Sequence, residues 1–274
     1  MKNKSTLSVT LAVYNESKNI TRCLEAIKDI ATEIVVVDGQ SQDDTVSLVN
    51  KFNNAKVIPT TNKPMFHINK QMGISACKGD WVLQLDADEI VTPELKKEIK
   101  SFLEKDINDI KENGFWIPRK NYFLGTFLKK GGQYPDPTIR FYKNGKAHLP
   151  CKDVHEQAEV DGLVGWLKND LEHYADTSFS LYFLRANRYT TLLAQELQEK
   201  QVKINFINFI NFYLLKPVWW FLKTFFRHRG YVDGFPGFVF SFYSALRFPI
   251  AYTKYYELIS TNRTINLSQD WDKK

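Results

Sequence analysis

The sequence predicts an α/β protein with a mostly parallel central sheet, helices on both faces of that sheet, and a helical region at its C-terminal end. Three observations lead to this prediction. Short β-branched, apolar runs alternate with helical patterns over the first hundred residues, which is typical of a parallel sheet. Beyond about residue 106 this alternation stops, and short strand-like runs lie among Gly- and Pro-rich loops. From Phe179 onward the pattern is helical and rich in aromatic side chains.

The elements of the first hundred residues follow in a regular order. Apolar runs predict strands, and helical spacing or helix-start signals between them predict helices. The expected strands are 7–13, 33–37, 56–58 and 81–85. The expected helices lie within 17–30, after Asp43 or Asp44, within 62–77, and after Thr92-Pro93-Glu94. In the following region we expect short strands within 114–127, 138–142 and 157–160.

Charge and aromatic residues are unevenly distributed along the 274 residues. The net charge of +6 comes from residues 179–274, which carry +7, whereas residues 1–178 carry −1. The same last third holds 24 of the 39 Phe, Tyr and Trp residues. We therefore expect three parts, with boundaries after residues 105 and 178.

The cysteines and the apolar segments limit the class of protein. Cys23, Cys77 and Cys151 are odd in number and far apart, which argues against a disulfide framework and a Cys-based zinc site. The N-terminus has no apolar stretch of the signal-peptide type. The longest uncharged apolar run of the last third, residues 204–215, has 12 residues, and spanning a bilayer takes about 20. These features predict a cytoplasmic protein without a transmembrane helix.

Two carboxylates, Asp86 and Asp88, follow the apolar strand 81–85. Parallel sheets bind ligands at the C-terminal ends of their strands, so both side chains are expected at that edge. Carboxylates placed there suit a hard divalent ion, Mg²⁺ or Mn²⁺, which keeps positions open for phosphate oxygens. Such an ion would neutralise the charge on a departing diphosphate. The alternative is an acidic loop that caps the helix after Pro93.

Several motifs, taken in this order, resemble the family 2 glycosyltransferases, which have the GT-A fold. The motifs are Leu-Ala12-Val-Tyr14-Asn15-Glu16, Val-Val-Asp38-Gly-Gln-Ser41-Gln-Asp43-Asp-Thr45, Lys70-Gln71-Met-Gly73 and Asp86-x-Asp88, and they cover roughly residues 5–90. Within this family the chain looks most similar to the lipopolysaccharide-core β-glucosyltransferases. That closer similarity rests on Leu85-Asp-Ala-Asp-Glu89, Tyr134-Pro-Asp136-x-x-x-Arg140-Phe, Val154-His155-Glu156 and Leu171-x-His173-Tyr174. Residue 71 is Gln, whereas the family usually has Asn at this position. The difference puts one loop contact of the family in question and leaves the resemblance unchanged.

The resemblance implies an inverting, metal-dependent transfer of a sugar, with glucose expected, from a UDP-sugar. Tyr14 would lie against the uracil ring, Asp38 would accept hydrogen bonds from the base or ribose, and Lys70 would lie near the nucleotide. Ordinary packing and solvated charge are the alternatives for Tyr14 and Lys70. The implied nucleotide-sugar-binding residues are Ala12, Tyr14, Glu16, Asp38, Lys70 and Asp86. Asp88 would bind Mg²⁺ or Mn²⁺ directly, and Asp86 would bind ribose or a metal-bound water.

An inverting transfer needs a general base to take the proton of the acceptor hydroxyl. Two carboxylates compete for this role: Asp136, which precedes Arg140 in a family-like pattern, and Glu156, which adjoins His155. If Asp136 is the base, His155 is the expected metal ligand and His173 its alternative. If Glu156 is the base, His173 becomes the expected ligand. The sequence favours Asp136 but leaves the pairing open.

The last third carries a different signal. Aromatic residues alternate with Lys and Arg at helical spacing between Phe206 and Arg229, which suits a helix lying among the headgroups of an anionic bilayer. The alternative is a helical subdomain that packs its aromatics against the catalytic domain. We expect no nucleic-acid partner, because no nucleic-acid fold motif accompanies these residues.

The resemblance also assigns roles to the three parts. Residues 1–105 would form the nucleotide-sugar-binding half, 106–178 the acceptor-binding half, and 179–274 a membrane-associating region. The expected acceptor is a glycan or glycolipid, with the lipopolysaccharide core favoured, at the inner face of the cytoplasmic membrane. Alternatives are another surface polysaccharide or lipid-linked acceptor, or a catalytically silent binding module. Nucleotidyl transfer is disfavoured, because no Gly-rich loop follows the first strand.

Overall fold

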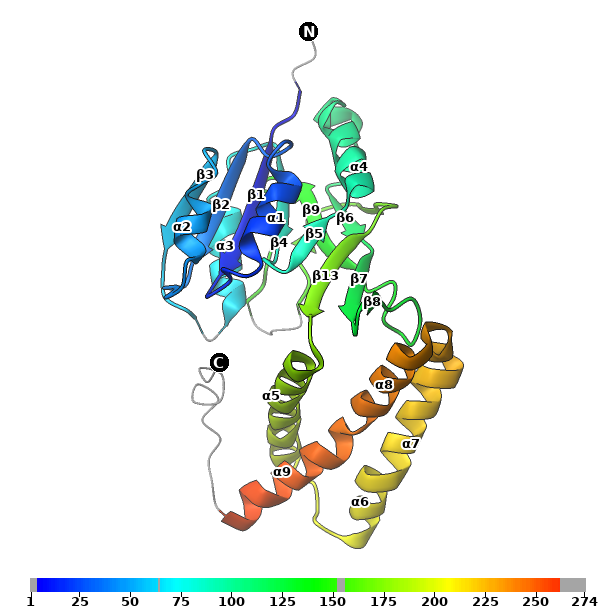
Figure 1. The fold of residues 1–274 in the computed structure, drawn as a ribbon. Helices are drawn as coiled ribbons and strands as arrows, with labels where there is room; N and C mark the ends of the chain where they lie inside the picture. The colour runs from blue at the N-terminus through cyan, green and yellow to red at the C-terminus, as the bar shows by residue number, and fades with distance from the viewer. Residues whose placement is uncertain (1–3, 64, 152–155, 262–274) are drawn as a thin grey trace. The chain divides into compact units, whose positions relative to one another are not determined.

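The structure is a computed structural model that describes residues 4–63, 65–151 and 156–261 (Figure 1). The chain divides into two compact units. Unit 1 comprises the residues up to Lys120 together with Asp136–His173. Unit 2 comprises Asn121–Pro135 and the residues from Tyr174 onward.

Unit 1 is built on a sheet that has seven strands within the described residues, in the order β12-β6-β9-β4-β1-β2-β3. β1 is parallel to β2 and β4, and β3 is parallel to β2. β9 is antiparallel to both of its neighbours, β4 and β6. The predicted mostly parallel sheet is therefore confirmed. Its strands are β1 (Leu7–Val13), β2 (Glu33–Asp38), β3 (Ala55–Pro59), β4 (Trp81–Leu85), β6 (Gly114–Ile117), β9 (Thr138–Lys143) and β12 (Val164–Trp166).

Helices cover both faces of this sheet, as predicted (Figure 1). Successive strand residues point to opposite faces, so each strand contributes to two cores. In β4, Leu83 packs into the core that α1 and α4 cover, whereas Val82 packs into the core that α3 covers. Thr92 caps α4 by accepting a hydrogen bond from the backbone N–H of Leu95. The helices are α1 (Ile20–Ile27), α2 (Thr45–Val49), α3 (Phe66–Ser75) and α4 (Pro93–Leu103), followed by a 3₁₀ turn, Ile107–Asp109.

The remaining strands form two smaller sheets. A four-stranded sheet among the described residues has the order β5-β13-β7-β8, and β10 pairs with β11. The region 114–127 was expected to hold strand structure, and it contains three separate strands, β6, β7 and β8. The strands of the smaller sheets are β5 (Glu89–Val91), β7 (Arg119–Phe123), β8 (Thr126–Phe127), β10 (Ala147–His148), β11 (Glu159–Val160) and β13 (Leu171–Asp176).

Unit 2 is mainly helical. The chain is continuously helical from Phe206 to Arg227, and two of its turns widen to π-helix. One core joins Phe212 to Tyr252 and Tyr255, and a second joins Phe123 and Leu128 to helix α8. Along the described residues no helix is long and apolar enough to cross a membrane. The elements are α5 (Phe179–Glu199), α6 (Phe206–Ile210), π-helical Asn211–Leu215, α7 (Lys216–Phe221), π-helical Leu222–Arg227, a 3₁₀ turn Gly230–Asp233, α8 (Gly234–Ala245) and α9 (Arg247–Thr261).

Candidate active site

A pocket of about 300 Å³ lies in unit 1, where β1 and β4 end. Its walls come from the turn after β1, from helix α3, and from the turn after β4. This is the edge at which parallel sheets bind ligands. The lining residues are Ala12, Val13, Tyr14, Glu16, Asn62, Phe66, Asn69, Lys70, Asp86, Ala87, Asp88 and His173. The pocket therefore brings together most of the predicted site residues.

The turn after β1 is fixed to the turn after β2 by hydrogen bonds. Asn15 has a positive φ of 55°, and its backbone N–H donates to the Ser41 hydroxyl over 2.9 Å. The backbone N–H of Glu16 donates to the Thr45 hydroxyl over 2.8 Å. Asp43 accepts a hydrogen bond from the backbone N–H of Ser17 over 3.1 Å. These contacts hold Tyr14 and Glu16 at the rim of the pocket and explain why both motifs are rich in small polar residues.

Asp86 lies between two cations. The Lys70 ammonium is 2.5 Å from its Oδ1, and the Arg140 guanidinium is 2.5 Å from its Oδ2. Burial alone would raise the pKa of Asp86, but the charges of Arg140 and Lys70 outweigh it and hold the pKa well below its usual range. Asp86 is therefore ionised, with both oxygens engaged in ion pairs.

The ion pairs continue away from the pocket through Glu89. This carboxylate is fully buried and accepts hydrogen bonds over 3.1 Å from both Arg140 and Arg119. Arg119 in turn binds Oδ2 of Asp136 through two nitrogen atoms, at 3.0 and 2.6 Å. Burial acts to lower the pKa of Arg119, but Glu89 and Asp136 raise it above its ordinary value. A chain of alternating charges thus joins the pocket to a predicted catalytic residue.

Asp88 projects into the pocket next to His173. Its Oδ2 is 3.5 Å from Nε2 of His173, and both side chains are partly exposed, at 26% and 16%. Within residues 4–63, 65–151 and 156–261, no group of three His, Cys, Asp or Glu side chains could hold a metal ion. Two adjacent ligands nevertheless fit a divalent ion whose other positions are filled by phosphate oxygens and water. Among the described residues, those that would hold the ion are Asp88 and His173, and the predicted ligand His155 stays a prediction.

The other predicted binding residues are placed in different ways. Ala12, at the end of β1, lines the pocket. The Asp38 carboxylate is almost fully buried and accepts a hydrogen bond from the backbone N–H of Ser41 over 3.1 Å, and it does not line the pocket. Gln71, the departure from the family pattern, accepts a hydrogen bond from the backbone N–H of Leu149 over 2.7 Å and so holds a neighbouring loop.

The two candidate bases lie outside the pocket lining. Asp136 is bound by Arg119 and its side chain is 39% exposed. Glu156 is 14% exposed, and its Oε2 is 3.9 Å from Nδ1 of the buried His67 on α3. His155, the expected metal ligand in one pairing, lies outside the described residues. The other candidate histidine, His173, is described and lies beside Asp88.

The sequence model of "Glycosyl transferase family 2" matches residues 8–146, just over half of the chain. The chain belongs to glycosyl transferase family 2. The matched region holds the strands, turns and carboxylates that form the pocket. The family, the α/β GT-A fold and the activity of a glycosyltransferase, all predicted from the motifs, are confirmed.

Two relatives in sequence are also described as glycosyltransferases. An uncharacterized glycosyltransferase of Rickettsia typhi is 31% identical over 99% of this chain and 92% of its own length. The lipopolysaccharide core biosynthesis glycosyltransferase LpsC of Rhizobium meliloti is 25% identical over 89% of this chain and 92% of its own length. Among solved structures, the mannosyltransferase PcManGT of Pyrobaculum calidifontis, in complex with GDP-Man and Mn²⁺, aligns with 98% of this chain and 79% of its own, with 14% identity and a TM-score of 0.47.

Proposed function

We propose that this family 2 enzyme transfers a sugar, with glucose favoured, from a UDP-sugar to a lipopolysaccharide-core acceptor with inversion at the anomeric carbon. The observation that carries the proposal is the pocket itself, in which Tyr14, Lys70, Asp86 and Asp88 surround one space. The similarity to LpsC over most of both chains supports the choice of acceptor. We assign residues 1–105 to donor binding and 106–178 to acceptor binding.

Each pocket residue has a task in this reaction. Tyr14 offers an aromatic face to the uracil ring, and Asp86, ionised between its two cations, accepts a hydrogen bond from the ribose. Glu16 and Ala12 complete the wall on the β1 side. Asp38 supports this wall from within the turn that it caps. Lys70 places a positive charge beside the position we assign to the diphosphate.

Asp88 and His173 are the residues that would hold Mg²⁺ or Mn²⁺. When bound, the ion supplies positive charge against the negative charge that develops on the leaving diphosphate. Asp86 is not assigned as a direct ligand, because Lys70 and Arg140 already balance its charge, although its oxygens can still accept a hydrogen bond from a hydroxyl group.

Asp136 is the general base in this proposal. It takes the proton of the acceptor hydroxyl while the hydroxyl oxygen forms a bond to the anomeric carbon and the bond from that carbon to the diphosphate breaks. Arg119 fixes the orientation of the carboxylate through two hydrogen bonds to one oxygen, Oδ2. The greater exposure of Asp136, 39% against 14% for Glu156, makes it the more accessible to an acceptor.

The direct test is a binding screen of UDP-, GDP- and dTDP-sugars in the presence of Mn²⁺. Tight binding of one UDP-sugar, and its transfer to a lipopolysaccharide-core acceptor, would support the proposal. Preference for a GDP- or dTDP-sugar would overturn the donor assignment. Transfer to a different glycan would overturn the acceptor assignment while leaving the family unaffected.

We also propose that the enzyme works at the inner face of the cytoplasmic membrane, held there peripherally by residues 179–274. A lipid-linked acceptor is available at such a surface. The excess of basic and aromatic residues in this part of the chain supports the placement.

A further inference from the structure

One long helical stretch of unit 2 presents an apolar surface outward. All residues from Phe206 to Arg227 are described, and eleven of them are exposed. Ten of these eleven are large hydrophobic residues, and the other is Arg227. A surface helix of a globular protein normally shows the opposite pattern, with polar residues on its outer face. The ten residues are Phe206, Ile207, Phe209, Tyr213, Leu214, Leu215, Val218, Trp219, Leu222 and Phe226.

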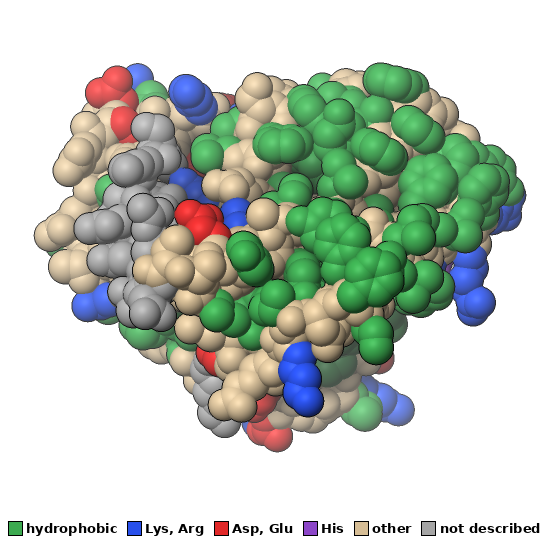
Figure 2. Space-filling view, turned by 90° about the horizontal axis from the view of Figure 1, so that it is seen from below, with side chains coloured by type: hydrophobic (Ala, Val, Ile, Leu, Met, Phe, Trp, Pro, Cys, Tyr) green, Lys and Arg blue, Asp and Glu red, His purple; other side chains and the backbone are tan. Residues whose placement is uncertain are grey.

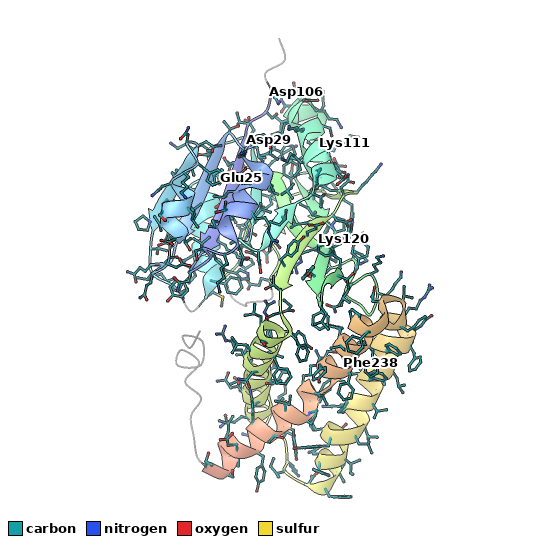
Figure 3. All side chains as sticks on the ribbon, viewed as in Figure 1. Glu25, Asp29, Asp106, Lys111, Lys120 and Phe238 are labelled. Carbon is teal, nitrogen blue, oxygen red and sulfur yellow. The ribbon has the colours of Figure 1, made fainter. Side chains whose placement is uncertain are left out.

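The inner side of the same stretch is already packed. Phe212, Pro217 and Thr224 are its buried residues, and the Phe212 ring stacks on that of Tyr252 at 4.8 Å between centroids. Helix α8 adds further exposed aromatics, among them Phe235, which is 73% exposed, and Phe238, labelled in Figure 3. Hydrophobic side chains accordingly cover a broad area in Figure 2. This apolar face exceeds what single exposed hydrophobic residues on a globular protein would explain.

Basic residues gather at one end of the apolar face. A hollow of about 540 Å³ is lined by Trp219, Leu222, Lys223, Arg227 and His228. The Lys223 ammonium lies 4.9 Å from the Trp219 ring centre and 5.1 Å from that of Trp220. The cation is therefore held at the apolar boundary.

Two more lysines belong to this basic end. The backbone N–H of Gly131 donates to the carbonyl of His228 over 2.9 Å, which brings the exposed Lys129 and Lys130 close to the hollow. Asp233 is engaged by the backbone N–H groups of these two lysines, at 2.9 and 2.8 Å. From Lys223 to Asp233 the chain holds three cations, Lys223, Arg227 and Arg229, and one carboxylate, Asp233. With Lys129 and Lys130 the basic end has five cations against one carboxylate and is therefore cationic.

We infer that this surface docks on the anionic headgroups of a lipid bilayer, with the hollow at Lys223 and Arg227 binding a lipid phosphate. The inference rests on the proposed peripheral membrane association and specifies its surface. Aromatic and aliphatic side chains would enter the boundary between headgroups and acyl chains, while the cations stay at the phosphates. Lys223 and Arg227, which line the hollow, lie at this edge of the apolar face.

A second copy of this chain would fit the surface less well. Two copies that met face to face would bring their basic ends together or leave them unpaired, whereas lipid phosphates supply the opposite charge. The pattern of a central apolar area and a cationic end is complementary to an anionic bilayer.

The test is co-sedimentation of the full chain with vesicles of equal parts phosphatidylglycerol and phosphatidylcholine, compared with pure phosphatidylcholine. We expect binding to the anionic vesicles and much weaker binding to the neutral ones. Changing both Lys223→Gln and Arg227→Gln should weaken the binding about thirtyfold, at about 1 kcal/mol for each charge lost near the membrane. The matched control is Lys97→Gln with Lys111→Gln (Lys111 labelled in Figure 3), two exposed lysines of unit 1, and it should bind within about twofold of the unaltered chain.

The apolar face is tested in the same assay. Leu222→Ser with Phe226→Ser should reduce binding at least tenfold, because each side chain loses apolar burial in the lipid. Leu163→Ser with Trp166→Ser alters two exposed residues of unit 1, at 62% and 58%, and should leave binding unchanged. Should the first pair fail to fold, lipids brominated on their acyl chains should still quench the tryptophan fluorescence of the unaltered chain, and Trp219→Phe should reduce that quenching.

Three results would overturn the inference. They are no vesicle binding by the unaltered chain, equal losses in the altered and control chains, or a dimer at micromolar concentration that the Leu222→Ser, Phe226→Ser pair abolishes. The last result would identify the surface as an interface between copies. Binding of a UDP-sugar, measured in parallel, separates failure of this inference from failure of the proposed function, because it depends on unit 1 residues alone.

Discussion

At the scale of single residues, the two carboxylates of the Asp86-x-Asp88 motif have different environments. Asp86 is held by Lys70 and Arg140, so its negative charge is already balanced within the protein. Asp88 has a histidine as its neighbour at 3.5 Å. We propose on this basis that these two identical side chains, two residues apart, have different roles, Asp86 in binding the ribose and Asp88 in binding a cation.

Replacing Asp88 tests the cation-binding role. We expect Asp88→Ala to lower sugar transfer at least a thousandfold and to remove the dependence of donor binding on Mn²⁺, since one of the two proposed ligands is lost. The measurements are transfer rate and donor binding at increasing Mn²⁺ concentration. Glu94→Gln, an exposed acid on α4, is the control. Near-normal turnover of Asp88→Ala with metal present would contradict the mechanism.

Replacing each candidate base decides between them. Asp136→Asn should lower transfer by about a hundredfold or more, which is the usual contribution of a general base, while donor binding stays unchanged. Glu156→Gln should lower transfer by less than about tenfold if Asp136 is the base. The measurement is the rate of transfer, together with its pH profile, for both variants. The reverse order of effects would identify Glu156 as the base.

Much of the candidate site could be predicted from the sequence because its residues follow strands that are easy to recognise. Tyr14 and Asp86 follow β1 and β4, and adjacent parallel strands end at the same edge. Arg119 and Glu89 could not be assigned roles in this way. Their partners are 17 to 51 residues away, on other strands or in a loop, so no spacing in the sequence indicates these ion pairs.

At the scale of elements, α3 lies close against β1 because residue 73 is glycine. A Cβ there would overlap the Thr10 hydroxyl and come within 3.2 Å of a Val37 methyl group. The glycine of the Lys70-Gln71-Met-Gly73 motif therefore brings Lys70 to the pocket by allowing close approach of helix and sheet. The motif has a packing reason as well as a chemical one.

Gly73→Ala tests this packing. We expect the free energy of unfolding to fall by about 1–3 kcal/mol, the usual cost of overpacking, although alanine favours helix. Ser75→Ala, an exposed change on the same helix, should cost less than about 0.5 kcal/mol. Urea unfolding of both variants measures the difference. An unfolding free energy of Gly73→Ala at or above that of the unaltered chain would show that α3 can shift without cost.

The hydrogen bonds that join the turn after β1 to the turn after β2 give a pH-dependent prediction. Burial acts to raise the pKa of Asp43, but hydrogen bonds from Thr45 and Ser17 outweigh it and lower the pKa from 3.8 to about 2. A lowered carboxyl pKa stabilises the folded state above pH 4, and this contribution is lost as the pH falls toward 2.

Asp43→Asn should therefore cost about 0.5–1 kcal/mol at pH 7, a small value because the site is exposed. The difference from the unaltered chain should shrink as the pH falls from 4 to 2. Urea midpoints across this range measure it. Asp44→Asn, whose side chain makes no cap hydrogen bond, should show no such trend. A cost for Asp43→Asn that is independent of pH would contradict the assigned role of the charge.

Elements were predicted best where a pattern is local. The expected strands 7–13 and 81–85 match β1 and β4, because unbroken apolar runs mark buried strands. The region 114–127 divides into three strands that belong to two sheets: β6 pairs with the distant β9 and β12, whereas β7 and β8 form a local hairpin, and no local spacing indicates this division. The continuous helix from Phe206 to Arg227 also contains π-helical turns, and these depend on tertiary packing rather than on residue spacing.

At the scale of the whole molecule, composition and contacts divide the chain differently. Composition changes near residue 179, whereas the compact units separate between His173 and Tyr174, and Asn121–Pro135 joins the second unit. A segment from the middle of the sequence thus completes a unit made mainly of the last third. The functional boundaries at 105 and 178 stay predictions.

Because Asn121–Pro135 belongs to the second unit, we can predict how a chain without the last third will behave. Phe123 and Leu128 are each 2% exposed and form a core with Val239, while Phe179 and Tyr182 pack around it. A chain of residues 1–178 keeps Phe123 and Leu128 but loses the residues that cover them. We expect it to bind a dye for exposed apolar surface and to elute from size-exclusion columns as aggregates. A chain of residues 1–261 keeps every described helix and should elute as the full chain does.

The opposite result would be a 1–178 chain that is monomeric, does not bind the dye and binds a UDP-sugar. It would show that Phe123 and Leu128 do not need the last third to shield them from water. Until that is measured, loss of membrane binding in such a chain could reflect misfolding as readily as loss of the docking surface. Point substitutions on the exposed face of unit 2 avoid this ambiguity, because they leave the Phe123 and Leu128 core intact.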